Sequence, residues 1–339
     1  MRETALAVCL AAPQAPVRLN SIEVAEPGPG EVTVRLEACG VCHSDLMISQ
    51  LESLPLTPLV LGHEGIGVVE ALGAGVTHIA VGTRVGINYL ASSCGSCEAC
   101  RRGAERFCLR QHNHGYTRHG ALTTRGVFAA QNLIALPPGL NPVAAAPLCC
   151  AGWTAYGAVR EANLQSGQLL AIFGLGGLGH LALHYARHRG LRVAAVDVSP
   201  QKLEFAQGLG AEAACTVEDA RKVIGKELGG AHGAIVFAAS ATAVATAFQT
   251  LKRGASLILV GMTAEKFSLG VTETVLKGIR IQGSYLGTRQ DLETVFDLAA
   301  QGLARPQVHS YPIDQAPEIF ARLKAGQILG RAVIEFQAS

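Results

Sequence analysis

The most specific chemical signal in the sequence is a set of four cysteines. Their pattern is Cys94-x2-Cys97-x2-Cys100-x7-Cys108, in a loop that also contains glycine. Four thiolates at this spacing can close a tetrahedron around one Zn²⁺ and leave no coordination position open for a substrate. The alternative is a set of reduced cysteines packed as small hydrophobic side chains, but cysteines seldom cluster in this way in a Gly-rich loop. The spacing therefore predicts a structural zinc site.

A glycine-rich motif lies in the second half of the chain. Residues 174–179 read GLGGLG and fit the pattern GxGxxG, which alone is common. Here the motif follows the apolar run Leu169–Phe173 and precedes a helical pattern, and Asp197 ends the next apolar run. A strand, a glycine turn, a helix and an acidic residue after the next strand are together typical of a dinucleotide-binding site.

Each glycine of this motif has an expected role. Gly174 permits the tight turn, Gly176 lets the backbone approach a pyrophosphate, and Gly179 lets the helix pack closely on the strand. The pyrophosphate would lie at the helix N-terminus, where unpaired N–H groups favour an anion. We also assign Gly177 and Leu178, which complete the turn, to the cofactor site.

Asp197 indicates which dinucleotide binds. Its carboxylate could accept hydrogen bonds from the adenosine ribose hydroxyls, and its charge would repel a 2′-phosphate. No Arg adjoins it in the sequence, so NAD is favoured over NADP. Lys202 could add a ribose contact. The alternatives are that Asp197 only caps a turn and that Lys202 is a solvated surface residue.

The elements that must position these residues change in kind near residue 150. Before it, short strand patterns are broken by Gly and Pro, such as the alternating residues Val32–Leu36 and the apolar run Ile66–Val69. This suits an all-β, barrel-like domain. After it, continuous apolar runs alternate with helical patterns such as 202–209, which predicts a parallel sheet covered on both faces. The continuous runs are Leu169–Phe173, Val193–Val196, Ile235–Ala238 and Leu257–Val260.

The last part of the chain contains a helical pattern, Asp291–Ala300, and a closing strand, Ala332–Phe336. We expect this tail to return to the first domain. We therefore expect an α/β protein in which residues 1–150, completed by 289–339, form the first, zinc-binding domain. Residues 151–288 would form the cofactor domain.

Composition excludes several other classes of protein. A chain of 339 residues is long enough for two domains, and its formal charge of +2, without a basic stripe, argues against a nucleic-acid partner. The uncharged stretches 142–159 and 233–251 are rich in small residues and turn signals, so we interpret them as buried core and expect no membrane span. The apolar stretch 5–12 is a poor signal peptide, and clustered thiols suit the reducing cytoplasm.

Seven segments together resemble the zinc-containing medium-chain alcohol dehydrogenases, of the shorter bacterial and yeast kind. The resemblance runs nearly from end to end, and it implies a GroES-like β-barrel catalytic domain followed by a Rossmann, doubly wound cofactor domain. The segments are GVCHSD (40–45), GHEGIGVVEALGAGV (62–76), the four-cysteine loop, CAGWTAYGA (150–158), GLGGLG (174–179), VDVSPQKLEFAQGLGA (196–211) and LGRAVI (329–334).

The resemblance also implies a second, catalytic zinc. No local spacing unites its ligands, which by the resemblance are Cys42, His63 and Cys150. Glu64 and Asp45 would lie just outside these ligands, with Asp45 orienting the His63 ring through its other nitrogen. Three protein ligands leave one position for a substrate oxygen. The nearby Cys39 and Cys149 do not match the ligand positions of the family, and we interpret them as small buried side chains.

Further roles follow from the same resemblance. Ser44 matches the hydroxyl that takes the substrate proton, with a local turn cap as its alternative. Members of the family often pass the proton on to a His three residues later, but here that position is Met47, so the outer route stays unassigned. His43 and Arg331 match contacts to cofactor phosphate, and Thr154 would approach the nicotinamide.

Substrate and assembly are less well marked. Tyr89 stands where relatives frequently carry Trp, and residues 49–59 contain no aromatic side chain, which suggests a roomier pocket for alcohols bulkier than ethanol. By analogy with family members of similar short chain length, we expect a homo-oligomer, and a homotetramer is favoured. His180, His184 and His188 recur every fourth residue, and we expect a partly exposed helix face there rather than a metal site.

The sequence therefore predicts a zinc-dependent oxidoreductase that transfers a hydride between a primary or secondary alcohol and NAD, with two zinc ions per chain. One alternative is a zinc aldehyde reductase that prefers NADPH, against which Asp197 argues. The other is a protein that binds zinc and nucleotide without turnover, for which Met47 is the only support. NADH formation at 340 nm with a panel of alcohols would separate these readings.

Overall fold

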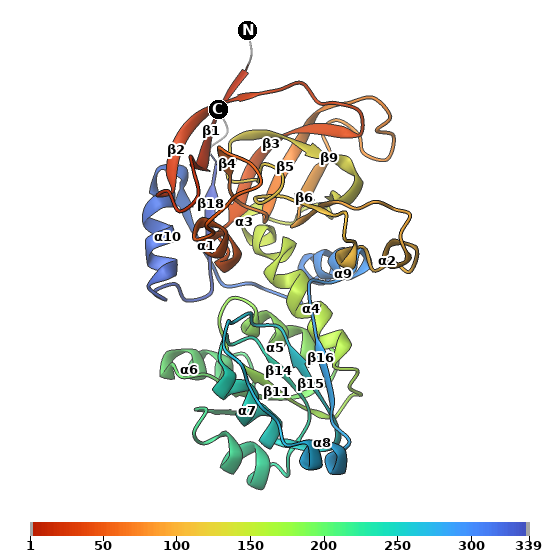
Figure 1. Cartoon of the computed structure of the whole chain (residues 1–339), viewed down its shortest axis with the longest axis vertical. Coiled ribbons are helices and arrows are strands. Elements are labelled where there is room, and N and C mark those ends of the chain that lie inside the picture. The colour runs from red at the N-terminus through yellow and green to blue at the C-terminus, as the bar shows by residue number, and fades with distance from the viewer. Residues whose placement is uncertain (1–2, 337–339) are drawn as a thin grey trace. The chain divides into compact units, whose positions relative to one another are not determined.

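The computed structural model describes residues 3–336, which divide into two compact units. Figure 1 shows the strands of unit 1 in red to yellow and at the blue C-terminal end, and those of unit 2 mostly in green to light blue. Within the described residues, unit 1 contains 3–151, 288–302 and 306–336, and unit 2 contains 152–287 and 303–305.

Unit 1 is built around one long central strand, β3 (Glu31–Gly40). It pairs antiparallel with β5 (Gly65–Leu72), β9 (Arg125–Ala129) and β18 (Arg331–Glu335), so the C-terminal strand lies within this sheet. Alternate residues of β3 are buried in the unit's core, as a period of two requires. The order of the main sheet is β10-β6-β5-β3-β18-β17, with β9 also on β3.

Two smaller sheets complete the strands of unit 1. One has the order β2-β1-β4, and the other pairs β7 with β8. The apolar stretch near the N-terminus is therefore a strand of this unit, within the residues that the structure describes. The remaining strands are β1 (Glu3–Leu10), β2 (Arg18–Val24), β4 (Leu59–Val60), β6 (Arg84–Ile87), β7 (Leu90–Ser92), β8 (His112–Asn113), β10 (Ile134–Ala135) and β17 (Val308–Pro312).

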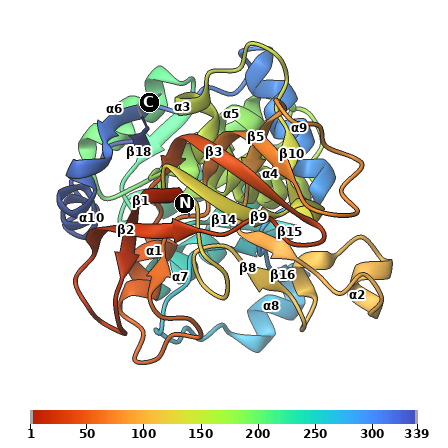
Figure 2. The same cartoon turned by 90° about the horizontal axis from the view of Figure 1, so that it is seen from above.

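Short helices join these strands. Figure 2 shows α2 on a loop that extends outward from the barrel strands. The helices of unit 1 are α1 (His43–Ser49), α2 (Glu98–Arg101), α3 (Pro142–Ala145), α9 (Arg289–Ala300) and α10 (Ala316–Lys324), with 3₁₀ turns η1 (Glu105–Phe107), η2 (Ala130–Asn132), η3 (Ala146–Cys149) and η5 (Ile313–Gln315). Helix α4 (Ala151–Glu161) starts at the last residue of the first segment and continues in unit 2.

Unit 2 contains a six-stranded sheet in which every pairing is parallel. The spatial order of the strands is β13-β12-β11-β14-β15-β16. From β11 the chain adds β12 and β13 on one side, and then returns to add β14, β15 and β16 on the other side. This is the arrangement of a doubly wound dinucleotide-binding sheet. The α/β prediction with a parallel sheet is confirmed. The strands are β11 (Leu169–Phe173), β12 (Arg192–Val196), β13 (Ala213–Cys215), β14 (Ala231–Val236), β15 (Leu251–Leu259) and β16 (Arg280–Gly283).

The helices of unit 2 alternate with its strands. They are α5 (Gly179–His188), α6 (Pro200–Gly208), the π-helix η4 (Arg221–Glu227), α7 (Ala241–Gln249) and α8 (Val271–Lys277). The start of β15 was not expected, because Lys252 and Arg253 interrupt its apolar pattern. The strand nevertheless pairs with β14 from Leu251 onward, across a register irregularity.

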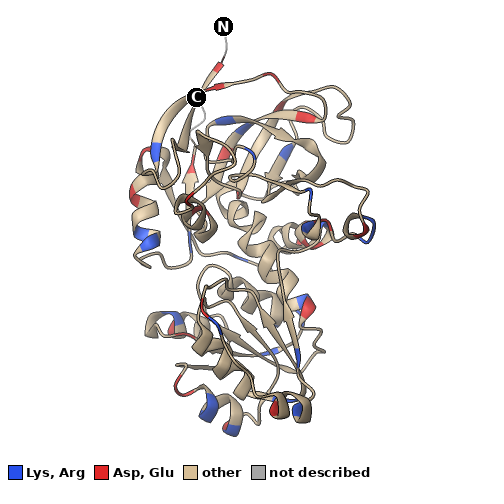
Figure 3. Cartoon of the chain, viewed as in Figure 1, with Lys and Arg blue, Asp and Glu red and all other residues tan. Residues whose placement is uncertain are grey.

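The two uncharged stretches form ordinary elements of the units. Residues 142–159 form α3, η3 and most of α4, and residues 233–251 form the end of β14, helix α7 and the start of β15. Among residues 3–336, no helix combines the length and apolar character needed to cross a membrane. Charges of both signs are interspersed, for example on α9 and α10 (Figure 3).

Candidate functional site

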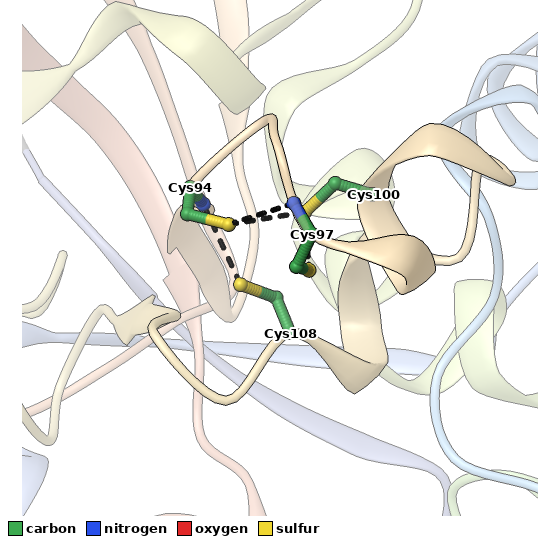
Figure 4. A group of neighbouring side chains, drawn as sticks. All are labelled: Cys94, Cys97, Cys100 and Cys108. Atoms are coloured by element: carbon green, nitrogen blue, oxygen red, sulfur yellow. Dashed lines mark hydrogen bonds between the residues drawn. The ribbon is translucent and has the colours of Figure 1, made fainter.

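The four cysteines predicted to bind a structural metal lie together in unit 1. Their sulfur atoms are all within 4.8 Å of one another. Figure 4 shows that they come from the turn before α2, from α2 itself and from the end of η1. The loop folds in this way because Gly95 and Gly103 adopt positive φ angles of 68° and 67°, which glycine tolerates best.

Backbone N–H groups support the sulfurs of this loop. The N–H of Cys97 donates to Cys94 Sγ at 3.4 Å, and the N–H of Cys94 donates to Cys108 Sγ at 3.5 Å. Hydrogen bonds from the N–H groups of Ser96 and Cys97 lower the pKa of Cys94 to about 5. Four sulfurs, at least one of them readily ionised, fit a closed tetrahedral zinc site.

A second group of possible metal ligands lies in the same unit. It consists of Cys42, His63, Glu64 and Cys150, all buried, with donor atoms within 4.8 Å of one another. Cys42 is the N-cap of α1, His63 and Glu64 lie between β4 and β5, and Cys150 ends η3. The structure thus brings together residues from three separate segments that no local spacing connects.

His63 is oriented for a metal ion by Asp45. The His63 Nδ1 atom lies 3.2 Å from Asp45 Oδ1, and both side chains are fully buried. Neither this contact nor any other among the described residues is a hydrogen bond of normal geometry, so both ring nitrogens, including the other one, Nε2, are buried without a hydrogen-bond partner. A lone nitrogen next to two thiols is what a zinc ion requires, so this donor set fits the metal.

Asp45 also holds the backbone of two ligand segments. Its Oδ2 atom accepts a hydrogen bond from the Cys42 N–H at 2.9 Å, as part of a capping box at the start of α1. Its Oδ1 atom accepts one from the Gly62 N–H at 3.1 Å. A single buried carboxylate therefore fixes the loop before α1 and the loop before β5.

The two thiols of the group differ in acidity. A hydrogen bond from Cys150 holds the pKa of Cys42 well below its ordinary value, despite burial, and the same bond raises the pKa of Cys150. Cys42 therefore loses its proton before Cys150. A Zn²⁺ ion would take the place of the remaining proton, since zinc binds both cysteines as thiolates.

Arg331 lies beside this group rather than at an exposed position. Its Nη2 atom is 2.5 Å and 2.6 Å from the two carboxylate oxygens of Glu64, and the two side chains are almost completely buried. Burial raises the pKa of Glu64 to about 7, although the Arg331 charge opposes the shift. The expected phosphate contact of Arg331 stays a prediction, while its pairing with Glu64 was not predicted.

Gly40 is a further residue that the sequence reasoning missed. A Cβ atom at this position would collide with the carboxylate of Glu64. The absence of a side chain therefore leaves room for the buried Glu64–Arg331 pair. A glycine at the end of a strand whose alternate residues are apolar was the available signal.

Two other expected residues, Ser44 and Tyr89, contact members of this second group of possible metal ligands. The Ser44 Oγ atom lies 3.7 Å from Cys42 Sγ. The Tyr89 ring contacts the His63 ring edge-on, with 5.2 Å between the centroids. His43, the first residue of α1, is exposed, and Met47 on the same helix is 47% exposed.

The duplicate cysteines are placed as small buried side chains. Cys39 and Cys149 are fully buried, and neither belongs to a group of possible metal ligands among the described residues. Their sulfurs approach the backbone carbonyls of Gly40 and Gly65. Burial raises the pKa of both thiols well above its ordinary value.

The glycine motif of unit 2 forms a turn between β11 and α5. Gly174 has a φ of 92°, and a Cβ atom there would lie 2.8 Å from the Ala238 nitrogen. A Cβ atom on Gly179 would collide with the carbonyl oxygen of Gly174. At Gly176, by contrast, a Cβ atom would meet nothing within 4 Å, so open space lies over the turn. These three environments fit a dinucleotide cradle.

Asp197 lies at the end of β12, next to this turn. Its carboxylate accepts hydrogen bonds from the N–H groups of Leu175 at 2.7 Å and Ser199 at 3.0 Å. The Lys202 Nζ atom is 3.8 Å from Asp197 Oδ1, so the two residues form an ion pair. Thr154, expected near the nicotinamide, is 8% exposed on α4.

The three regularly spaced histidines do not share one environment. His180 is 2% exposed, which contradicts the expectation of a partly exposed face at this position. His184 is half-buried and His188 is exposed. None of the three belongs to a group of possible metal ligands in the described part of the chain.

Comparison with known proteins identifies the family. A model of the alcohol dehydrogenase GroES-like domain matches residues 28–138, and a model of the zinc-binding dehydrogenases matches residues 177–301. An alcohol dehydrogenase of Geobacillus stearothermophilus is 40% identical over 324 residues, which cover 94% of this chain and 96% of that protein.

Solved structures agree with the sequence comparison. The alcohol dehydrogenase from Aeropyrum pernix matches with a TM-score of 0.89 and 31% identity, over 98% of this chain and 100% of that chain. Acetophenone reductase from Geotrichum candidum, solved in complex with NAD, matches with a TM-score of 0.86 and 30% identity, over 99% of this chain and 98% of that chain. The predicted GroES-like and Rossmann-type folds are confirmed. The chain therefore belongs to the zinc-containing medium-chain alcohol dehydrogenases, and it is an alcohol oxidoreductase that uses zinc and a nicotinamide cofactor.

Proposed function

We propose that this enzyme interconverts a primary or secondary alcohol and its aldehyde or ketone with NAD, at a zinc ion held by Cys42, His63 and Cys150. The observation that carries the proposal is the buried His63 Nε2 atom, which has no partner among the described residues and lies within 4.8 Å of the two thiols. The bound zinc would act as a Lewis acid on the substrate oxygen, and the nicotinamide would accept or donate the hydride.

The chain's own residues would hold this centre and move the proton. Asp45 keeps His63 in the tautomer that leaves Nε2 unprotonated, and Glu64 with Arg331 adds a balanced pair of charges beside the thiols. Ser44 lies next to Cys42, so its hydroxyl is placed to take the proton of a substrate alcohol. Met47 cannot pass that proton on, and its exposure favours release to solvent.

NAD is the proposed cofactor because the charge of Asp197 would repel a 2′-phosphate. The carboxylate is already held by two backbone N–H groups, so it is fixed in place and ready to accept from ribose hydroxyls. Lys202 offsets part of its charge and could contact the ribose. His43, Thr154 and Arg331 complete the proposed cofactor contacts, together with Gly174, Gly176, Gly177, Leu178 and Gly179. The structural relative solved with NAD supports this preference.

One assay and one analysis test the proposal together. Initial rates at 340 nm with NAD and with NADP, across alcohols from ethanol to aromatic secondary alcohols, should show turnover with a higher kcat/KM for NAD. Because Tyr89 and the segment 49–59, which contains no aromatic side chain, suggest a roomy pocket, we expect bulkier alcohols to be preferred over ethanol. Elemental analysis should find two zinc ions per chain; active protein with zinc only at the four cysteines would refute the mechanism.

We also propose that the chain assembles as a homotetramer. Strand β16 is an edge of the six-stranded sheet, and Ile281 on it is 41% exposed. The adjacent α8 exposes Val271, Val275 and Leu276, each at least 67% accessible. An edge strand beside an exposed apolar helix suits pairing with another copy. Light scattering after size-exclusion chromatography tests the mass, and Leu276→Glu should reduce it.

We further place the enzyme in the reducing cytoplasm. All ten cysteines are free in the structure. Six of them belong to the two groups of possible metal ligands, and Cys149 is the neighbour of Cys150 in the sequence. These thiols can hold zinc only while they stay reduced. Fractionation of cells that express the chain, with detection in the cytoplasmic and secreted fractions, would test this placement.

A further inference from the structure

His180 is a buried imidazole at the glycine turn that the reaction described above does not use. It follows the last glycine of the motif directly and is the second residue of α5. It is only 2% exposed, although a helix surface was expected here. Histidine is rarely completely buried without a specific partner, so its contacts are informative.

The imidazole is bonded to the turn itself. The His180 Nδ1 atom lies 2.9 Å from the carbonyl oxygen of Gly176, and the His180 backbone N–H lies 3.3 Å from the same oxygen. A carbonyl oxygen can only accept, so Nδ1 must carry the proton. Two donors of one residue thus converge on the middle glycine of the motif.

This double contact fixes the orientation of one peptide group. In a trans peptide, the C=O and N–H point in opposite directions, so holding the Gly176 oxygen toward α5 turns the Gly177 N–H away from it. Gly176 and Gly177 are consecutive glycines, which have the largest conformational freedom of any residues. A side-chain clamp on this peptide therefore reduces the freedom that cofactor binding would otherwise have to remove.

The other side of the imidazole reaches a second part of the same site. Its ring packs against Phe205 on α6, with 6.2 Å between the centroids and an angle of 47° between the planes. Helix α6 begins just after Asp197 and carries Lys202, the residues proposed to face the ribose. His180 therefore joins the turn proposed for the pyrophosphate to the helix that follows the ribose carboxylate.

We propose that His180 is a positioning residue for the cofactor. Its Nδ1–H locks the Gly176–Gly177 peptide so that the turn is already shaped for a pyrophosphate before the dinucleotide arrives. This inference rests on the proposed dinucleotide site. It predicts that loss of the Nδ1 donor weakens cofactor affinity and raises the KM for NAD, with a much smaller effect on kcat.

Two substitutions separate the donor from the ring. In His180→Asn, the amide nitrogen occupies the position of Nδ1 and can still donate to Gly176. In His180→Gln, the amide lies one carbon further out, near the position of Nε2, so that donor is lost while polarity is retained. The exposed His188→Gln on the same helix is the matched control.

Affinities for NADH, measured by fluorescence titration, and for ADP-ribose, measured by calorimetry, provide readouts that need no turnover. We expect His180→Gln to weaken the binding of both ligands by about threefold to tenfold, which corresponds to one net hydrogen bond. The affinities of His180→Asn should lie close to those of the unchanged enzyme. Melting temperatures of the three variants show whether each is folded. Equal affinities of the Asn and Gln variants would overturn the inference. Failure of the unchanged enzyme to bind either ligand would instead overturn the proposed cofactor site.

Discussion

Replacement of Asp45 by asparagine tests how the proposed ligands of the catalytic zinc, Cys42, His63 and Cys150, are held. The carboxylate accepts from the Cys42 N–H at 2.9 Å and from the Gly62 N–H at 3.1 Å, and its Oδ1 atom lies 3.2 Å from His63 Nδ1. An amide has one oxygen, so its NH₂ group must face at least one of these donors in either orientation. Asp45→Asn therefore leaves a buried N–H without an acceptor and removes the charge that orients the imidazole.

The expected size of the effect follows from these contacts. One unsatisfied buried donor costs about 1–3 kcal/mol of folding stability, and loss of an orienting partner weakens zinc binding by about 10- to 100-fold. Zinc transfer to a chromogenic chelator should show one zinc ion leaving faster in the variant while the other keeps its rate. Dehydrogenase activity should fall at the same rate as the faster-leaving zinc ion is lost.

Asp291→Asn is the matched control for Asp45→Asn. Asp291 is 4% exposed and forms the same capping box at the start of α9, where it accepts from the Thr288 N–H at 2.7 Å. The control should lose stability without faster zinc release. If both variants retain zinc like the unchanged protein, the role assigned to Asp45 is wrong.

Three further changes test other parts of the structure. Ser44→Ala should lower kcat by about 100-fold or more while the protein keeps two zinc ions per chain. Ser49→Ala on the same helix should change neither value much. Initial rates and elemental analysis measure the two quantities. Cys100→Ser should reduce zinc from two ions to one and lower the melting temperature, because serine is a poor zinc ligand, while Cys215→Ser should retain both ions. Burial lowers the pKa of His114 from 6.5 to about 4 in the folded protein. As the pH falls from 6.5 to 4, this imidazole is therefore protonated in the unfolded chain before it is protonated in the folded one, and the free energy of unfolding should decrease. The loss should approach about 3 kcal/mol. Denaturant titrations between pH 7 and 4 should show a shallower decline in His114→Asn.

The sequence predicted features that are encoded by local patterns. Continuous apolar runs such as Leu169–Phe173 require burial on both faces, and they form the parallel sheet of unit 2. The four cysteines are close in the chain, so their spacing alone indicated a shared metal. The start of β15 was missed because its charged residues, Lys252 and Arg253, look like a loop, and they lie in an irregular stretch between the paired residues Leu251 and Ser256.

The proposed catalytic group could not be predicted from spacing, because its residues meet only through the fold. Family resemblance supplied Cys42, His63 and Cys150, but neither pattern nor resemblance gave the pairing of Glu64 with Arg331, which are 267 positions apart. A signal was nevertheless present. Arg331 begins an otherwise apolar strand, and charges in apolar surroundings need a partner.

The histidines of α5 show why a correct periodicity can still mislead. A step of four residues turns an α-helix by about 400°, so each successive side chain is displaced by about 40° around the axis. Across His180, His184 and His188 the displacement is enough to pass from the buried side to the exposed side, as their exposures show. The first histidine therefore reaches the glycine turn while the last meets solvent. A shared period fixes the relation among side chains, but the packing of the helix decides which of them can act on a site.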